Sequence, residues 1–223
     1  MILQRAQQGL PLLVTTLAVA LVTLSGIRVP RAVAKDAGDE FSALELSKLA
    51  AGKLVRRPVV QRRGDLHLIG GTSFQVIDAP MHVVWQALLD TAHYPRMMPE
   101  VVEAKVVRKE SSRRTLFMRQ GSLSMLEVKY FLNVQLDSKQ RDIEFRLDDS
   151  RSNDLRKAYG FYNLRPFEGA ESKRTLLSYG IMADIGSGIL VSLARDKVHD
   201  WMLRTPWMVK RFIEGSGRYI YNW

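Results

Sequence analysis

The four histidines are the first side chains to consider for metal binding or acid–base catalysis. His67, His82, His93 and His199 are spread along the chain, and none stands in an HxH, HxxxH or HExxH pattern. Zinc sites are usually marked by such spacings. The chain also lacks a GxSxG elbow, a P-loop and a GxGxxG motif. We therefore predict no metal, no cofactor and no catalytic residue from these motifs.

Carboxylates are densest at Asp148, Asp149 and Asp154, with Glu144 nearby. Paired carboxylates can transfer protons when they are buried. These acids fall at the end of a predicted strand and in the loop after it, among several arginines. Charged residues in such a loop are usually solvated. We interpret the group as a solvated hairpin and not as a catalytic pair.

The remaining candidates for a functional site are apolar and aromatic side chains. The same residues would pack a solid core in any fold, so a filled interior is the alternative interpretation. Two features favour a cavity: tyrosine hydroxyls need a partner in the protein or in a ligand, and methionines adapt to different apolar ligands. The candidate cavity residues are Tyr130, Leu132, Phe145, Tyr162, Leu164, Leu177, Tyr179, Trp201, Met202 and Met208.

Strands must position most of these residues. Between residues 124 and 136, apolar and polar residues alternate over a long span, which predicts a half-buried strand. We expect Gly70–Gly71 to form a turn before the strand 72–77. The other predicted strands are 59–69, broken near Gly64, and 104–109, 114–120, 143–147, 155–165 and 174–183. Short strands at even spacing predict an antiparallel sheet with one face covered.

Helices are predicted on both sides of the strand-rich region. Residues 41–54 have helical apolar spacing, with Ser42 as the N-cap. A second helix follows Pro80 and ends near Asp90. Leu190–Ile213 keeps an apolar stripe that should cover the sheet, and Pro206 should kink or split this helix.

Composition and the N-terminus suggest an exported protein. Residues 1–34 combine Arg5, an uncharged apolar run and the small-x-small site Ala32–Ala34, as a signal peptide does, although an uncleaved membrane anchor is the alternative. The chain has no cysteine, which excludes disulfides and thiolate chemistry. Removing residues 1–34 leaves 30 basic against 23 acidic residues, a net charge of +7 that suits an anionic membrane surface. We predict no nucleic-acid partner.

The order of motifs after residue 72 carries a family resemblance. It runs through Phe74, Val76, Ala79-Pro80, Val84-Trp85, Leu88, Asp90, Tyr94-Pro95, Pro99 and Val101, and later through Gly160-x-Tyr162-x-Leu164-x-Pro166 and Thr175–Tyr179. This order resembles the START-like (SRPBCC) superfamily, in particular an exported bacterial member of the polyketide cyclase/dehydrase and coenzyme-Q-binding group. Members of that group usually have Trp where this chain has Tyr162.

The resemblance implies an α+β helix-grip fold. In that fold a curved antiparallel sheet of about six or seven strands wraps a long C-terminal helix, with a hydrophobic cavity between them. We accordingly expect a signal peptide at 1–34, a polar lead, helix and short strand at 35–71, and a START-like domain at 72–223.

Three functions compete for this chain. The first is an exported, periplasmic or extracellular protein that binds or carries a lipid, quinone or polyketide-like molecule. The second is a cyclase or aromatase in which Tyr130, Tyr162 or Tyr179 would donate a proton. The third is a non-catalytic interaction module that docks a partner through the helix at 41–54. An apolar ligand, with an anionic membrane as a further partner, is the interpretation that we prefer, while the step from fold to ligand rests on analogy.

Overall fold

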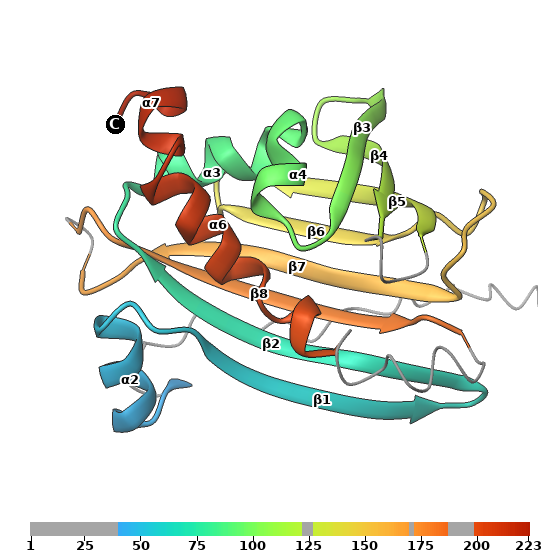
Figure 1. The fold of residues 1–223 in the computed structure, drawn as a ribbon, viewed down its shortest axis with the longest axis horizontal. Helices are drawn as coiled ribbons and strands as arrows, with labels where there is room; N and C mark the ends of the chain where they lie inside the picture. The colour runs from blue at the N-terminus through green and yellow to red at the C-terminus, as the bar shows by residue number, and fades with distance from the viewer. Residues whose placement is uncertain (1–39, 122–126, 170–171, 187–198) are drawn as a thin grey trace, which may run out of the picture. The chain divides into compact units, whose positions relative to one another are not determined.

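The computed structural model describes residues 40–121, 127–169, 172–186 and 199–223. Within these ranges eight strands form one antiparallel sheet in the order β1-β2-β8-β7-β6-β5-β4-β3 (Figure 1). The strands are β1 Val55–Arg63, β2 Leu66–Ile77, β3 Val101–Lys109, β4 Arg113–Gln120, β5 Val128–Asp137, β6 Asp142–Leu147, β7 Lys157–Pro166 and β8 Thr175–Asp184. The predicted α+β class and single antiparallel sheet are confirmed. The predicted signal peptide lies outside the described residues.

The sheet has eight strands, compared with the six or seven that the resemblance implied, and the two strands predicted at 59–69 and 72–77 are observed as β1 and β2 with different bounds. β1 pairs along its whole length with residues 66–74 of β2, and a turn at Gly64 and Asp65 joins the two strands. The turn predicted at Gly70–Gly71 is wrong, since β2 continues through both residues. A Cβ atom on Gly70 would lie 1.9 Å from the carbonyl oxygen of Ile181, and one on Gly71 would lie 2.2 Å from that of Arg57. Glycine is required here because both neighbouring strands approach closely.

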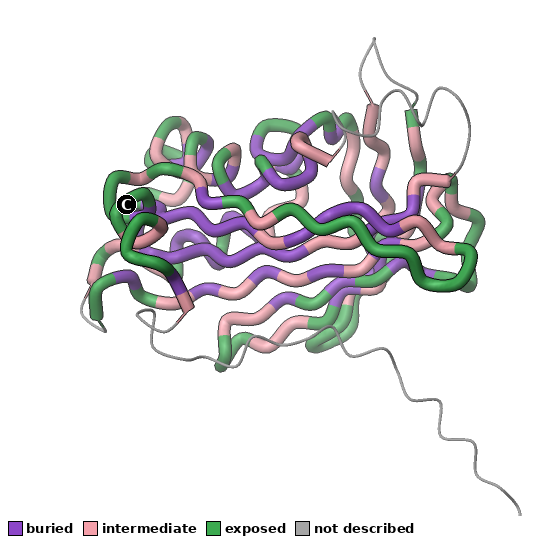
Figure 2. Tube along the Cα trace, turned by 90° about the horizontal axis from the view of Figure 1, so that it is seen from below, coloured by how far each residue is buried: buried purple, intermediate pink, exposed green. Residues whose placement is uncertain are grey.

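Side-chain alternation along β2 separates two apolar cores on opposite faces of the sheet. Ile69 and Ile77 belong to the main core, on the face that we call inner. Phe74 and Val76 point to the outer face and pack with Leu49 of α2 (Ala43–Ala50). Figure 2 shows the buried residues as segments that recur along the central strands, whereas β1 is exposed from Pro58 to Arg63.

The helices of the inner face come from two distant parts of the chain. They are α3 Met81–Leu89, the 3-10 helix η1 Thr91–His93, α4 Tyr94–Met97, α6 Thr205–Glu214 and α7 Gly217–Tyr221. Val83 and Val84 of α3 and Val209 and Ile213 of α6 enter the main core. None of the helices in the described ranges is both long and apolar enough to cross a membrane.

The predicted split of the C-terminal helix at Pro206 is confirmed. Residues 199–202 are helical, residues 203 and 204 form a turn, and Pro206 lies in the first turn of α6. Proline lacks the N–H that a continuous helix would need there, whereas it fits a first turn. The predicted residues 190–198 lie outside the described ranges.

The N-terminal helix α2 begins as predicted. The Glu45 N–H donates to the Ser42 hydroxyl, and the Ser42 N–H donates to Glu45 Oε2 at 2.9 Å, which forms a capping box. The helix ends at Ala50, earlier than predicted, and Gly52 follows with φ of +67°. Leu49 is buried on the outer face of the sheet and Leu46 is partly buried there, whereas Leu44 is exposed.

Candidate functional site

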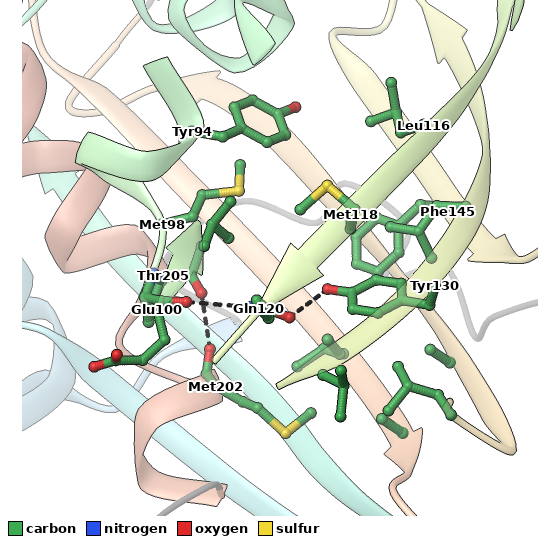
Figure 3. Close-up of a pocket in the computed structure, with 18 of the residues that line it drawn as sticks. Tyr94, Met98, Glu100, Leu116, Met118, Gln120, Tyr130, Phe145, Met202 and Thr205 are labelled. Carbon is green, nitrogen blue, oxygen red and sulfur yellow. Dashed lines mark hydrogen bonds between the residues drawn. The ribbon is translucent and has the colours of Figure 1, made fainter. Parts of the chain in front are cut away.

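A cavity of about 550 Å³ lies between the inner face of the sheet and the residues that lead into α6. Strands β4 to β8 supply most of its wall, α4 and the segment after it supply a second side, and residues 201–205 supply a third (Figure 3). The side chains on the strands are mainly apolar because every second residue points inward. The strand residues of the wall include Leu116, Met118, Tyr130, Leu132, Val134, Ile143, Phe145, Ala158, Tyr162, Tyr179 and Ile181.

Most of the predicted cavity residues lie on this wall. They are Tyr130, Leu132, Phe145, Tyr162, Tyr179, Trp201 and Met202. Residues from several strands and from the segment before α6 are therefore brought around one space, although they are up to 72 positions apart in the sequence, from Tyr130 to Met202. That these side chains bind a ligand stays a prediction.

Leu164, Leu177 and Met208 do not line the cavity. Leu164 and Leu177 are paired neighbours on β7 and β8, and both are buried in the main core. At this end of the sheet α3 packs on β7 and α6 packs on β8, so helices occupy the space. Met208 is half-buried on α6 and lies off the stripe that α6 buries. Periodicity identifies the inward face of a strand but cannot say which part of that face meets a helix.

β4 is also part of the wall, although none of its residues is among the predicted cavity residues. Leu116, Met118 and Gln120 alternate along β4 and all face the cavity. The same alternation in the sequence could have identified Leu116 and Met118. Gln120 carried no such signal because a polar residue at the end of a strand is usually solvated.

Tyr130 and Tyr94 have hydrogen-bonding partners within the protein. The Tyr130 hydroxyl donates to Oε1 of Gln120, whose Nε2 donates to the Pro99 carbonyl at 3.1 Å (Figure 3). The Tyr94 hydroxyl donates to the Leu88 carbonyl at 2.8 Å. Burial raises the pKa of both tyrosines above its ordinary value. Both hydroxyls are therefore protonated at neutral pH.

A second group of hydroxyl-bearing residues lies on β7, β8 and the start of α6. Tyr162 and Tyr179 form a side-chain hydrogen bond, and Tyr179 forms another with Thr205. Thr205 Oγ1 donates to the Met202 carbonyl at 3.0 Å. Tyr162 donates to Tyr179, because their hydrogen bond raises the Tyr162 pKa and lowers the Tyr179 pKa. Burial is the main cause that raises the pKa of Tyr162 and of Tyr179. Tyr162, Tyr179 and Thr205 therefore form a network of neutral hydroxyls.

Charged side chains reach the cavity only at its exposed end, as far as the described residues show. They are Glu100, Glu127 and Asp154. Glu127 Oε2 accepts from Arg119 at 2.9 Å, and this hydrogen bond is the main cause that lowers the Glu127 pKa. Asp154 accepts from the Lys129 N–H at 2.7 Å. No group of three or more histidines and acids within the described ranges is arranged to hold a metal.

The predicted solvated acidic hairpin is only partly correct. Asp149 is exposed and pairs with Lys157 Nζ at 2.7 Å. Asp148 is buried instead, and its Oδ1 accepts from the Ser150 hydroxyl at 2.6 Å. That hydrogen bond is the main cause of the lowered Asp148 pKa. Asp148 therefore organises the loop and is not available for proton transfer.

Comparison with known families gives one match. The family model described as "Polyketide cyclase / dehydrase and lipid transport" matches residues 77–205. That range includes β3 to β8, the helices α3 and α4, and the segment that leads into α6. Among curated proteins no relative matches.

Several solved structures resemble this fold. TTHA0849 from Thermus thermophilus is 17% identical with a TM-score of 0.52, over 62% of this chain and 89% of that protein. The Zhui aromatase/cyclase from Streptomyces sp. R1128 is 14% identical with a TM-score of 0.50, over 68% and 99%. The di-domain ARO/CYC StfQ from the steffimycin biosynthetic pathway is 12% identical with a TM-score of 0.53, over 70% and 53%. At these identities the likeness establishes a shared fold.

Proposed function

The chain belongs to the polyketide cyclase/dehydrase and lipid transport family of the START-like superfamily, and from that premise we propose that it binds an apolar small molecule or lipid. The observation that carries the proposal is the apolar cavity of about 550 Å³. Ligand pockets generally measure roughly 300–1,000 Å³ and are lined mainly by apolar and aromatic side chains. Removing apolar ligand surface from water contributes about 25 cal/mol per Å².

The wall of the cavity supports a ligand of flexible shape. Met98, Met118 and Met202 come from three separate segments of the chain and all line the space. Their unbranched side chains can adjust to different apolar surfaces. An apolar void without a ligand forgoes dispersion contacts on its whole wall, so filling it should stabilise the fold.

We further propose that the protein carries its ligand outside the cytoplasm, in contact with an anionic membrane. Export rests on the signal-like residues 1–34 and stays a prediction. A fusion of these residues to a reporter enzyme that is active only after export would test it. Cytoplasmic retention of the reporter would contradict export without affecting ligand binding.

A surface of α6 and α7 supports membrane contact. We define the α6–α7 surface as Trp207, Arg211, Arg218, Tyr219 and Ile220. Trp207 is 38% exposed, Tyr219 is 91% exposed, and the Arg211 guanidinium lies 4.9 Å from the centre of the Trp207 ring. Tryptophan and tyrosine favour the membrane–water interface, and arginines attract anionic headgroups. α6 begins at Thr205, which lines the cavity, so Trp207 at the start of this surface is two residues from the ligand site.

The two alternative functions receive less support from the described residues. A cyclase needs an acid or base in the cavity, but the tyrosine hydroxyls are bonded within the protein, and Glu127 is exposed and paired with Arg119. An interaction module would have a filled core and a free helix at 41–54. The structure instead has a cavity, and Leu49 of α2 is buried against the sheet.

The direct test is native purification followed by extraction and mass spectrometry. The wild-type protein from its own host should release an apolar compound in near-stoichiometric amount. Ala158→Trp and Met118→Trp each place a large ring in the cavity and should abolish recovery, whereas Ala92→Trp, at an exposed position, should not. Circular dichroism would establish that the variants fold. Recovery of no apolar compound from the wild type, together with no uptake of lipid or neutral fluorescent probes, would overturn the proposal.

A further inference from the structure

We infer that the cavity selects uncharged ligands that carry at most a carbonyl, ester or hydroxyl oxygen, and that it rejects carboxylates, sulfonates and phosphates. This inference rests on the proposed ligand binding and names the chemical class of the ligand. Two observations carry it: where the hydrogen-bond donors of the cavity are directed, and which charges lie on its wall.

Most hydroxyl hydrogens on the cavity wall already have an acceptor within the protein. Tyr130 donates to Gln120, Tyr94 donates to the Leu88 carbonyl, and Thr205 donates to the Met202 carbonyl. Tyr162 donates to Tyr179. These four hydroxyls can accept a hydrogen bond but cannot donate a second one, which leaves the Tyr179 hydroxyl as the one possible donor of the five. An anion needs several donors and finds at most one among these hydroxyls.

The backbone of the wall offers an anion no better partner. Strands β4 to β8 are paired with one another along the cavity, so their N–H groups serve the sheet. Two side-chain N–H groups remain: the second hydrogen on Gln120 Nε2, and Trp201 Nε1, which is buried with no partner among the described residues. A neutral N–H suits a carbonyl or hydroxyl oxygen. One or two such donors do not compensate for the hydration that a full negative charge loses on burial.

The charges on the cavity wall also disfavour a negatively charged ligand. Among the described residues that line it, the charged side chains are the carboxylates of Glu100, Glu127 and Asp154. Arg119 lies one residue from Gln120, on the outer face of β4, and its side chain is bound to Glu103 and Glu127. An anionic headgroup would therefore meet carboxylates of its own sign and no available cation on the described part of this wall. Like charges raise the cost of placing it there.

A matched pair of dyes tests the inference. N-phenyl-1-naphthylamine is neutral, and 8-anilino-1-naphthalenesulfonate has the same rings with one permanent negative charge. Titration of the full-length protein should give cavity binding of the neutral dye at least tenfold tighter than that of the sulfonate. Because a basic surface can bind the sulfonate, the signal of the Ala158→Trp variant is subtracted as the contribution from outside the cavity.

A second pair of ligands compares a neutral alcohol with an acid of the same chain length whose charge depends on pH. Both 1-decanol and decanoic acid should displace N-phenyl-1-naphthylamine, but only the protonated acid should enter. Carboxyl groups have an ordinary pKa of about 4. The affinity of decanoic acid should thus fall roughly tenfold per pH unit between pH 6 and 8, as its protonated fraction does, while that of decanol stays constant.

A gain-of-function variant completes the test. Gln120→Lys places an ammonium group at the half-exposed end of the cavity, where it should improve sulfonate and decanoate binding at least fivefold. Gln61→Lys makes the same charge change on the exposed part of β1 and should have no effect. Equal cavity affinity for both dyes, or a decanoic acid affinity independent of pH, would overturn the inference while leaving ligand binding intact. If no neutral probe binds, the proposed function itself fails.

Discussion

Tyr162 and Tyr179 are paired residues on adjacent strands, their ring centres are 4.8 Å apart, and their hydroxyls are hydrogen-bonded to each other inside the cavity wall. Because Tyr179 also forms a hydrogen bond with Thr205, the pair joins the sheet to the first residue of α6. A START-like sheet and the helix that it grips are thus connected here by a polar contact within an apolar wall. The contact closes the ligand space on one side without adding a charge.

This contact predicts unequal and non-additive losses of stability. Tyr179→Phe leaves the Tyr162 hydroxyl without its acceptor, and an unsatisfied buried hydroxyl costs about 1–3 kcal/mol. Tyr162→Phe removes the donor and leaves no other donor without its acceptor, and Tyr179 keeps its hydrogen bond with Thr205, so that variant should lose less. The double variant should lose less than the sum of the two single variants. Urea unfolding of all four proteins measures the coupling. Strictly additive losses would show that the two hydroxyls act independently.

The packing of the outer core predicts that two leucines of α2 contribute very differently to the free energy of unfolding. Leu49 is 0% exposed against the sheet, whereas Leu44 is 65% exposed. Leu49→Ala should lower the free energy of unfolding by about 2–5 kcal/mol, and Leu44→Ala should change it by less than about 0.5 kcal/mol. Thermal and urea unfolding of the two variants provide the measurement. Similar small losses in both would mean that α2 is not packed on the sheet.

The Glu45 carboxylate of the α2 capping box predicts a contribution to stability that is lost in acid. Hydrogen bonds from Arg57, the first cause, and from Ser42 lower the Glu45 pKa to about 2 from an ordinary 4.5. A depressed folded-state pKa stabilises the protein above the unfolded-state pKa, and this contribution disappears as the pH falls from about 4.5 to about 2. Glu45→Gln should therefore flatten the stability curve in that window. The exposed Glu144→Gln should leave the slope unchanged, and equal slopes in all three proteins would contradict the prediction.

The α6–α7 surface predicts salt-dependent binding to vesicles. Arg211→Gln should weaken binding to vesicles of mixed neutral and anionic phospholipids roughly fivefold, because one arginine near such a surface contributes about 1 kcal/mol. Trp207→Ala should weaken binding with less dependence on salt, since its contribution is mainly apolar. Arg62→Gln, on the exposed part of β1, is the matched control. If neutral vesicles bind equally well, or if Arg62→Gln has the same effect as Arg211→Gln, the membrane contact lies elsewhere.

The sequence by itself determined the type and order of the elements. Alternation at Tyr130, Leu132 and Val134 predicts the inward face of β5, Ser42 predicts the start of α2, and Pro206 predicts the break before α6. These signals are local, because side-chain period, capping and a missing N–H each act over a few residues. Gly70 and Gly71 misled the prediction for the same reason: their local preference is a turn, whereas the close approach of Ile181 and Arg57 requires them within a strand.

Tertiary structure alone decided which inward-facing residues of the sheet border a cavity and which are covered by a helix. Tyr162 and Leu164 lie on the same face of β7, yet only Tyr162 borders the cavity, because α3 occupies the space over the other end of the strand. It also decided that the tyrosine hydroxyls are satisfied, since Gln120 and Thr205 are distant in sequence from the segments that they complete. A cavity and its free donors depend on contacts between separate elements, and no periodicity within one element encodes them.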